Sequence, residues 1–286
     1  MNQVICISNS KGGVGKTTTA LNLSAGLTLL GAKVLAIDAD PQADLTAHMG
    51  WTRSDELEIT LNTKLKDVLM ENGDDPLSGI LHHPEGIDLL PSNLELSSME
   101  MNLVNAMSRE TVLRSYVSEV RDMYDFIVID CQPSLGMVSL NALTSADSVI
   151  IPVQAQYLPA KGMTDLLNTI QKVGRHLNPT ISIEGILITL VDNRTNLAKN
   201  TIQTIQDTFG DRLRIFPDTI PIAVKVAEAS AKGQSIFSYD ASCPAAKAYM
   251  NLAEEVVRDA EREQARNQAR SSFIGKQLLL SIYGMY

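Results

Sequence analysis

SNSKGGVGKTTTA, residues 8–20, is the stretch that decides the fold of this 286-residue chain. A short apolar run, QVICIS at 3–8, precedes it, and a helical pattern follows it with apolar side chains at 20, 23, 27 and 30. A glycine-rich turn between a strand and a helix presents backbone N–H groups and a helix N-terminus to an anion. The stretch therefore predicts a phosphate-binding loop, and a glycine-rich turn without a ligand is the alternative.

Each residue type in this loop has a chemical reason. Glycines at 12, 13 and 15 allow the backbone to curl tightly around a phosphate. Lys16 is expected to reach the β- and γ-phosphates of a nucleotide, and the Thr17 hydroxyl is expected to ligate Mg²⁺. The general motif leaves the position of Lys11 free, so a solvated surface lysine is the ordinary interpretation of that residue.

Short apolar runs alternate with helical patterns along most of the chain. The runs at 3–8, 33–38, 125–130, 147–153 and 183–191 are apolar almost throughout, which is typical of strands buried on both faces of a parallel sheet. Apolar residues at 166, 170 and 173 predict a crossover helix, and those at 249, 252 and 256 predict a last core helix. We therefore predict an α/β fold with a doubly wound, mostly parallel sheet, in which 51–109 is the least regular segment.

The composition limits the classes of function. With 24 basic and 33 acidic residues the net charge is −9 and the pI about 5.0, which argues against a protein that coats nucleic acid constitutively. Three cysteines, at 6, 131 and 243, are far apart in the sequence and indicate neither a disulfide framework nor a metal cluster. There is no basic leader and no run of 18 apolar residues, so we expect a soluble, cytoplasmic protein.

Longer segments carry a resemblance to a known family. KGGVGKTT at 11–18 resembles the deviant Walker A box of the ParA/MinD ATPases, in which the first lysine reaches across a dimer interface to the partner's nucleotide. VLAIDADPQADLT at 34–46 is similar to the switch I segment of that family, and YDFIVIDCQPSLG at 124–136 to its Walker B segment. Segments at 89–103, 185–200 and 219–240 resemble the ParA/Soj branch. The resemblance implies a P-loop ATPase domain over 1–258 and leaves a helical extension and tail of unknown role at 259–286.

The resemblance also implies roles for three aspartates. Asp40 would orient the attacking water, Asp38 would lie near the metal, and Asp130 would hold Mg²⁺. The ordinary role of an aspartate at a strand end is a helix cap or a turn. The implied catalytic residues are Lys11, Lys16 and Asp40, the implied metal ligands are Thr17, Asp38 and Asp130, and the implied ATP contacts are Lys11, Gly12, Gly13, Val14, Gly15, Lys16, Thr17, Thr18 and Pro221.

Two positions depart from the family pattern. Gln132 replaces a proline that is usual in the Walker B segment, and Ile222 replaces an arginine that contributes to DNA binding. Arg194 and Lys225 match other DNA-binding positions of the family, although a solvated surface cation is the ordinary role of either residue. Contact with DNA could instead be shifted to Lys199, Lys232 and Lys247.

The function implied by the resemblance is DNA partition. Two copies would form a homodimer around two Mg·ATP molecules, bind DNA without sequence preference at the nucleoid, and separate when a ParB-type partner stimulates a slow ATP hydrolysis. The main alternative is a MinD-like membrane ATPase, because residues 271–286 contain an apolar cluster, although Lys276 is their single basic residue. An electron-transfer relative would need paired cysteines, and a metabolic P-loop enzyme would need a substrate-binding insertion, for which 51–109 is the candidate.

Overall fold

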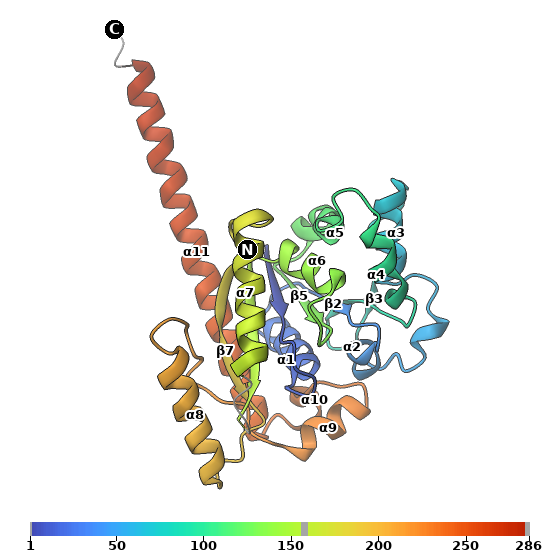
Figure 1. Cartoon of the computed structure of the whole chain (residues 1–286), viewed down its shortest axis with the longest axis vertical. Coiled ribbons are helices and arrows are strands. Elements are labelled where there is room, and N and C mark those ends of the chain that lie inside the picture. The colour runs from blue at the N-terminus through green and yellow to red at the C-terminus, as the bar shows by residue number, and fades with distance from the viewer. Residues whose placement is uncertain (1, 156–159, 284–286) are drawn as a thin grey trace.

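A seven-stranded sheet forms the centre of the computed structural model, which describes residues 2–155 and 160–283 and, within them, the side chains outside 160–161 and 267–283. The strand order is β3-β4-β2-β5-β1-β6-β7 (Figure 1). Adjacent strands are parallel except β3 and β4, so the predicted α/β class with a mostly parallel sheet is confirmed. The strands are β1 (Gln3–Ile7), β2 (Val34–Ala39), β3 (Leu81–His82), β4 (Asp88–Leu90), β5 (Phe126–Cys131), β6 (Ser148–Gln154) and β7 (Ser182–Thr189).

Helices cover both faces of this sheet. On one face lie α1, α2, α10 and α11, and on the other lie α3 to α8. Successive residues of β1 alternate between the two cores: Val4 and Cys6 pack on the α3 to α8 side, and Ile5 and Ile7 on the α1 side. The helices are α1 (Lys16–Leu29), α2 (Asp44–His48), α3 (Leu61–Met70), α4 (Leu96–Val104), α5 (Val112–Val120), α6 (Met137–Ser145), α7 (Ala160–His176), α8 (Asn196–Phe209), α9 (Val224–Ala231), α10 (Ile236–Asp240) and α11 (Pro244–Tyr283).

The strands expected from continuous apolar runs are all present, with boundaries within two residues of the expected ones. The sequence did not indicate β3 and β4, which lie in the irregular segment 51–109 and contain two and three residues. β4 pairs with β2, the strand that carries Asp38, and extends the sheet on that side. Strands this short do not show a pattern of alternation, because alternation needs at least four residues to be recognised.

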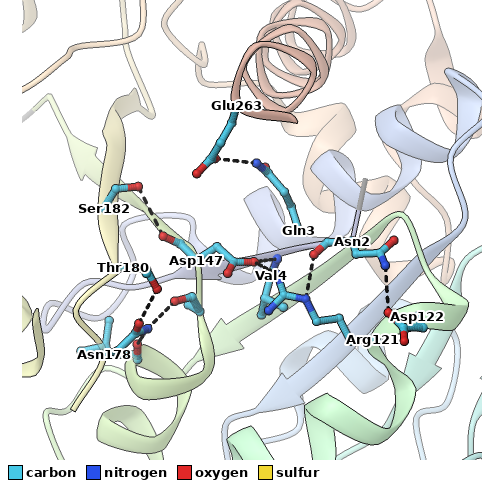
Figure 2. A network of polar contacts seen from close by, with 12 residues as sticks. Asn2, Gln3, Val4, Arg121, Asp122, Asp147, Asn178, Thr180, Ser182 and Glu263 are labelled. Atoms are coloured by element: carbon cyan, nitrogen blue, oxygen red, sulfur yellow. Dashed lines mark hydrogen bonds and ion pairs between the residues drawn. The ribbon is translucent and has the colours of Figure 1, made fainter. Parts of the chain in front are cut away.

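The last helix, α11, is 40 residues long and runs through the boundary expected at residue 258. Its first half packs against α1, where a Cβ added to Gly26 would lie 2.9 Å from Cβ of Ala253. Arg214 forms ion pairs with Glu255 and Asp259 of this helix. Further along, Oε2 of Glu263 accepts a hydrogen bond from Nε2 of Gln3 at 2.9 Å, and the rest of the helix extends away from the sheet (Figures 1 and 2). Contacts with the domain therefore continue slightly beyond the expected boundary, which stays a prediction.

A network of hydrogen bonds and an ion pair lies at the edge of the sheet where the strands begin (Figure 2). Oδ2 of Asp147 accepts hydrogen bonds from the backbone N–H of Val4 at 2.8 Å and from Nη2 of Arg121 at 2.6 Å. Nε of Arg121 also donates to the Asn2 carbonyl oxygen at 2.9 Å. These bonds fix the start of β1, whose other end leads directly into the glycine loop.

Over the ranges 2–155 and 160–283, no helix combines the length and the apolar character needed to cross a bilayer.

Candidate functional site

The glycine loop joins the end of β1 to the start of α1, as the sequence predicted. Gly13 and Gly15 have φ angles of 70° and 83°, a left-handed backbone that other residues rarely adopt. Gly15 is the N-cap of α1 and has no side chain to cap it, so the first N–H groups of the helix face the loop. Two hydrogen bonds fix the loop. Oγ1 of Thr189, at the end of β7, donates to the Val14 carbonyl at 2.7 Å. Within the loop, the backbone N–H of Lys11 donates to Oδ1 of Asn9 at 3.0 Å. The result is a rigid anion-binding loop.

Lys16 is a buried lysine at the first position of α1. Its Nζ donates to the Lys11 carbonyl oxygen across the loop at 3.1 Å. Burial lowers the pKa of this ammonium, and the nearby carboxylates of Asp130 and Asp40 act in the opposite direction. A cation that is held inside the loop with little solvent around it is well suited to contact phosphate oxygens.

The three predicted aspartates come together beside this loop. Asp38 and Asp130 are register partners at the ends of β2 and β5, and Asp40 follows β2. Oδ2 of Asp38 accepts hydrogen bonds from the N–H and hydroxyl of Thr46 at 2.8 and 2.7 Å, and Oδ1 accepts from the Asp40 N–H at 3.2 Å. Burial raises the pKa of Asp38 to about 7 against these bonds, and burial also raises the pKa of Asp40.

Asp130 is the carboxylate that the described protein atoms leave unsatisfied. It is fully buried, and neither of its oxygens has a hydrogen-bond partner of normal geometry among the described residues. Burial and the neighbouring Asp38 raise its pKa well above the ordinary value, and the nearby Thr17 hydroxyl lowers it only in part. Buried carboxylates without partners are expensive unless they bind a cation. A hard cation with oxygen ligands fits this arrangement, so Asp130, Thr17 and Asp38 are suited to hold Mg²⁺ directly or through water.

An apolar cavity of about 310 Å³ adjoins the glycine loop. Gly15 and Thr18 line it at the loop end, and Pro221 lines it on the opposite side. His48, at the end of α2, is a lining residue that the sequence did not indicate, and burial lowers its pKa. The structure thus brings Pro221 into one cavity with Gly15 and Thr18 of the loop, and the adenine contact expected for Pro221 stays a prediction.

Lys11 is partly exposed at the opening of the loop. Its backbone is fixed by Asn9, but no carboxylate among the described residues pairs with its side-chain ammonium. The two lysines therefore differ in their surroundings. Nζ of Lys16 donates to a carbonyl of its own loop, whereas the side chain of Lys11 is partly exposed.

The two predicted DNA-binding residues lie near the same edge of the sheet. A bridge between Val191 and Pro221 places the segments before Arg194 and Lys225 side by side. Both side chains are exposed and ion-paired: Arg194 binds Asp192 through two hydrogen bonds of 2.9 Å, and Lys225 binds Asp240. These pairs lower the pKa of Asp192 and of Asp240 to about 2. The structure thus brings the two cations together but leaves their charges largely compensated.

The three alternative cations lie on different elements: Lys232 at the end of α9, Lys247 on α11 and Lys199 on α8. Lys232 lies over the ring of Tyr239, with Nζ 4.9 Å from the ring centroid. Lys247 lines a separate cavity between α1 and α11, and Lys199 is exposed on α8.

The fold and the site together define a class of protein. A phosphate-binding loop after β1, a buried lysine in that loop and two carboxylates at the ends of adjacent parallel strands are the features of a P-loop nucleotide-binding ATPase. A family model described as an AAA domain matches residues 2–183.

Curated relatives identify the family within this class. The chromosome-partitioning ATPase Soj of Treponema pallidum is 40% identical over 265 residues, which cover 92% of this chain and 100% of that protein. The chromosome partitioning protein ParA of Caulobacter vibrioides is 36% identical over 268 residues, or 92% and 97% of the two chains. The chain belongs to this Soj/ParA family of ATPases.

A solved structure supports the same assignment of the fold. Cobyrinic acid a,c-diamide synthase from Mycobacterium smegmatis with bound ADP and magnesium has a TM-score of 0.77 and 32% sequence identity to this chain. The match covers 90% of this chain and 95% of that one.

Proposed function

We propose that this chain is a partition ATPase whose two copies close face to face around two Mg·ATP molecules. The observation that carries the proposal is the contrast between the two lysines of the loop. Lys16 is buried and directed at its own phosphate site, whereas Lys11 lies at the opening without a partner among the described residues. An unpaired ammonium beside a phosphate site is suited to bind the triphosphate of a second copy. The names of the Treponema and Caulobacter relatives supply the process, chromosome partition.

ATP then acts as a control on DNA affinity. One copy presents Arg194 and Lys225, each already paired with a carboxylate, on a chain with a net charge of −9. Such a monomer should bind DNA weakly. A dimer doubles the set of cations and holds both sets in one orientation, so phosphates can compete with Asp192 and Asp240 for them. Binding of this kind has no sequence preference. It would place the ATP-bound protein on the nucleoid, within the cytoplasm.

Hydrolysis resets the dimer. Asp40 lies beside Lys16 and Asp130, and its carboxylate is suited to orient a water for in-line attack. Among the described residues, none of those suited to contact the phosphates or Mg²⁺ is an arginine, and an arginine at the transferred phosphoryl group is typically worth about 10³ to 10⁵ in rate. We therefore expect slow basal hydrolysis that needs no acceptor substrate, and a ParB-type partner that accelerates it.

The test is the oligomeric state with ATP and Mg²⁺. Asp40→Ala should trap ATP without hydrolysing it, so gel filtration should show a stable dimer. Adding Lys11→Ala to that variant should give monomers that still bind a fluorescent ATP analogue, because Lys16 is unchanged. Lys33→Ala is the matched control, since Lys33 is an exposed lysine at the start of β2. Monomers of Asp40→Ala with ATP, or dimers that persist without Lys11, would contradict the proposal.

A further inference from the structure

One carboxylate holds the loop that follows Asp130. Glu100, on α4, accepts a hydrogen bond from Nε2 of Gln132 at 2.8 Å. The same carboxylate accepts from the backbone N–H groups of Met137 at 2.7 Å and Val138 at 3.1 Å. These two N–H groups belong to the first turn of α6 and would otherwise lack partners. Glu100 therefore ties the beginning of the loop to its end.

Gly136 provides the space for this contact. It is the N-cap residue of α6 and has no side chain to cap the helix. A Cβ at this position would lie 2.5 Å from Oε1 of Glu100, so any larger residue would displace the carboxylate. The negative charge also lies at the positive end of the α6 dipole, which strengthens the contact.

The loop held in this way borders the phosphate site. A Cβ on Gly12 would be in van der Waals contact, at 4.0 Å, with Cβ of Pro133. Gln132 is two residues after Asp130, the carboxylate suited to the metal. Gln132 departs from the family pattern, in which this position is usually a proline and therefore has no side-chain donor. In this chain, the departure adds a direct bond between the loop and α4.

We infer that Gln132 and Glu100 are positioning residues of the ATPase site. Their hydrogen bond holds loop 132–136 beside the phosphate-binding loop, and this keeps Asp130 and the loop backbone aligned for hydrolysis. The inference rests on the nucleotide site proposed above. Nucleotide affinity comes from residues 12–18, so the loss of the bond should lower kcat and leave binding nearly unchanged. A misplacement of about 1 Å can cost on the order of 10²-fold in rate.

The experiment compares Gln132→Ala with the wild type, using the full chain. With saturating ATP and Mg²⁺, we expect kcat to fall about tenfold, since the loop keeps its other contacts. KM and the Kd of a fluorescent ATP analogue should stay within about twofold, because the phosphate-binding loop is intact. Gln203→Ala is the matched control: its amide also donates to a carboxylate, Asp207 at 2.8 Å, but on the exposed face of α8. This control should keep the wild-type kcat.

A double variant tests whether the two residues act as a unit. Glu100→Gln weakens the same tie, so adding Gln132→Ala to it should cause little further loss of kcat. Hydrogen exchange of the amides at 134–138 should be faster in Gln132→Ala, which reports the loop independently of activity. Wild-type kcat and wild-type exchange in Gln132→Ala would overturn the inference, as would losses that multiply in the double variant. If instead Lys16→Ala bound the ATP analogue as tightly as the wild type, the proposed nucleotide site itself would be wrong.

Discussion

Asp130→Asn should make the protein more stable when no nucleotide is present, although it removes a residue suited to hold Mg²⁺. The carboxylate is fully buried and has no hydrogen-bond partner of normal geometry among the described residues, so the nearby Lys16 and Thr17 offset only part of the cost of burying its charge. Asparagine has nearly the same shape and no charge. Folding would then no longer require the desolvation of an anion.

The neighbouring Asp38 gives the scale of this effect. Its pKa rises from an ordinary 3.8 to about 7 in spite of its hydrogen bonds, which corresponds to about 4 kcal/mol of stability lost at high pH. The pKa of Asp130 shifts in the same direction, because burial and the neighbouring Asp38 both disfavour its charged form. Replacing buried charged groups by neutral ones stabilises proteins by about 1–4 kcal/mol in favourable cases, and we expect a gain of this order for Asp130→Asn at pH 8.

The sign of the pH dependence follows from the raised pKa. Well below the ordinary pKa of 3.8, the wild-type carboxyl is protonated in both the folded and the unfolded chain, so the substitution changes little. Above that pH the unfolded chain releases its proton first, and the wild type loses stability until the folded pKa is reached. The advantage of Asp130→Asn should therefore grow with pH by up to about 1.4 kcal/mol per pH unit.

Thermal unfolding of the full chain between pH 5 and 8, followed by circular dichroism without nucleotide, measures this difference. Asp147→Asn is the control, because that carboxylate is paired with Arg121 and Val4 at the opposite edge of the sheet, and its loss should lower stability (Figure 2). Adding Mg·ATP should raise the Tm of the wild type more than that of Asp130→Asn. A lower stability of Asp130→Asn at pH 8, or a gain that does not change with pH, would refute the reasoning.

Two further substitutions address the DNA surface and α11. Ile222→Arg introduces an arginine at an exposed position beside Val191, where the family pattern has one. In the ATP-bound dimer it should steepen the slope of log Kd against log salt by about 1.8, as measured by anisotropy of a labelled duplex. An unchanged slope would exclude Ile222 from the DNA surface. Gly26→Ala places a Cβ 2.9 Å from the Cβ of Ala253. The clash should lower the free energy of unfolding by about 1–3 kcal/mol, and the better helix propensity of alanine should offset up to about 1 kcal/mol of this loss. Adding Ala253→Gly should restore part of the stability. If the two effects were additive, α1 and α11 would not be in the tight contact described.

The sequence was sufficient for the sheet and for the phosphate-binding loop because their signals are local. A glycine-rich turn specifies its own backbone, and the apolar runs that end in Asp38 and Asp130 place both carboxylates at the same edge of a parallel sheet. The partners of the site residues were not predictable in this way. Nothing near Glu100 in the sequence indicates that it caps α6. Glu100 and Met137 are 37 residues apart in the chain, and only the packing of α4 near α6 brings them together.

Pairs that depend on tertiary structure show the same limit. The cysteines at 6 and 131 are far apart in the chain, yet adjacent strands bring their sulfur atoms within 3.1 Å, both as free thiols. Arg194 and Lys225 match DNA-binding positions, but the family pattern does not show that Asp192 and Asp240 already hold them. A pattern of residue types predicts where a cation lies, whereas its availability depends on carboxylates that the fold brings near it.

The two edges of the sheet differ in whether their charged groups are paired, and this difference explains where function can develop. At the edge where the strands begin, Asp147 and Arg121 satisfy each other and fix β1 (Figure 2). At the edge where the strands end, Asp130 has no hydrogen-bond partner of normal geometry among the described residues, and Nζ of Lys16 donates to a backbone carbonyl. The ion pair at the first edge stabilises the folded chain. The unpaired charges at the second edge destabilise it, and binding of a cation and a triphosphate can restore that stability. Nucleotide and metal binding should therefore stabilise this chain, because the ligands supply the charges that this edge lacks.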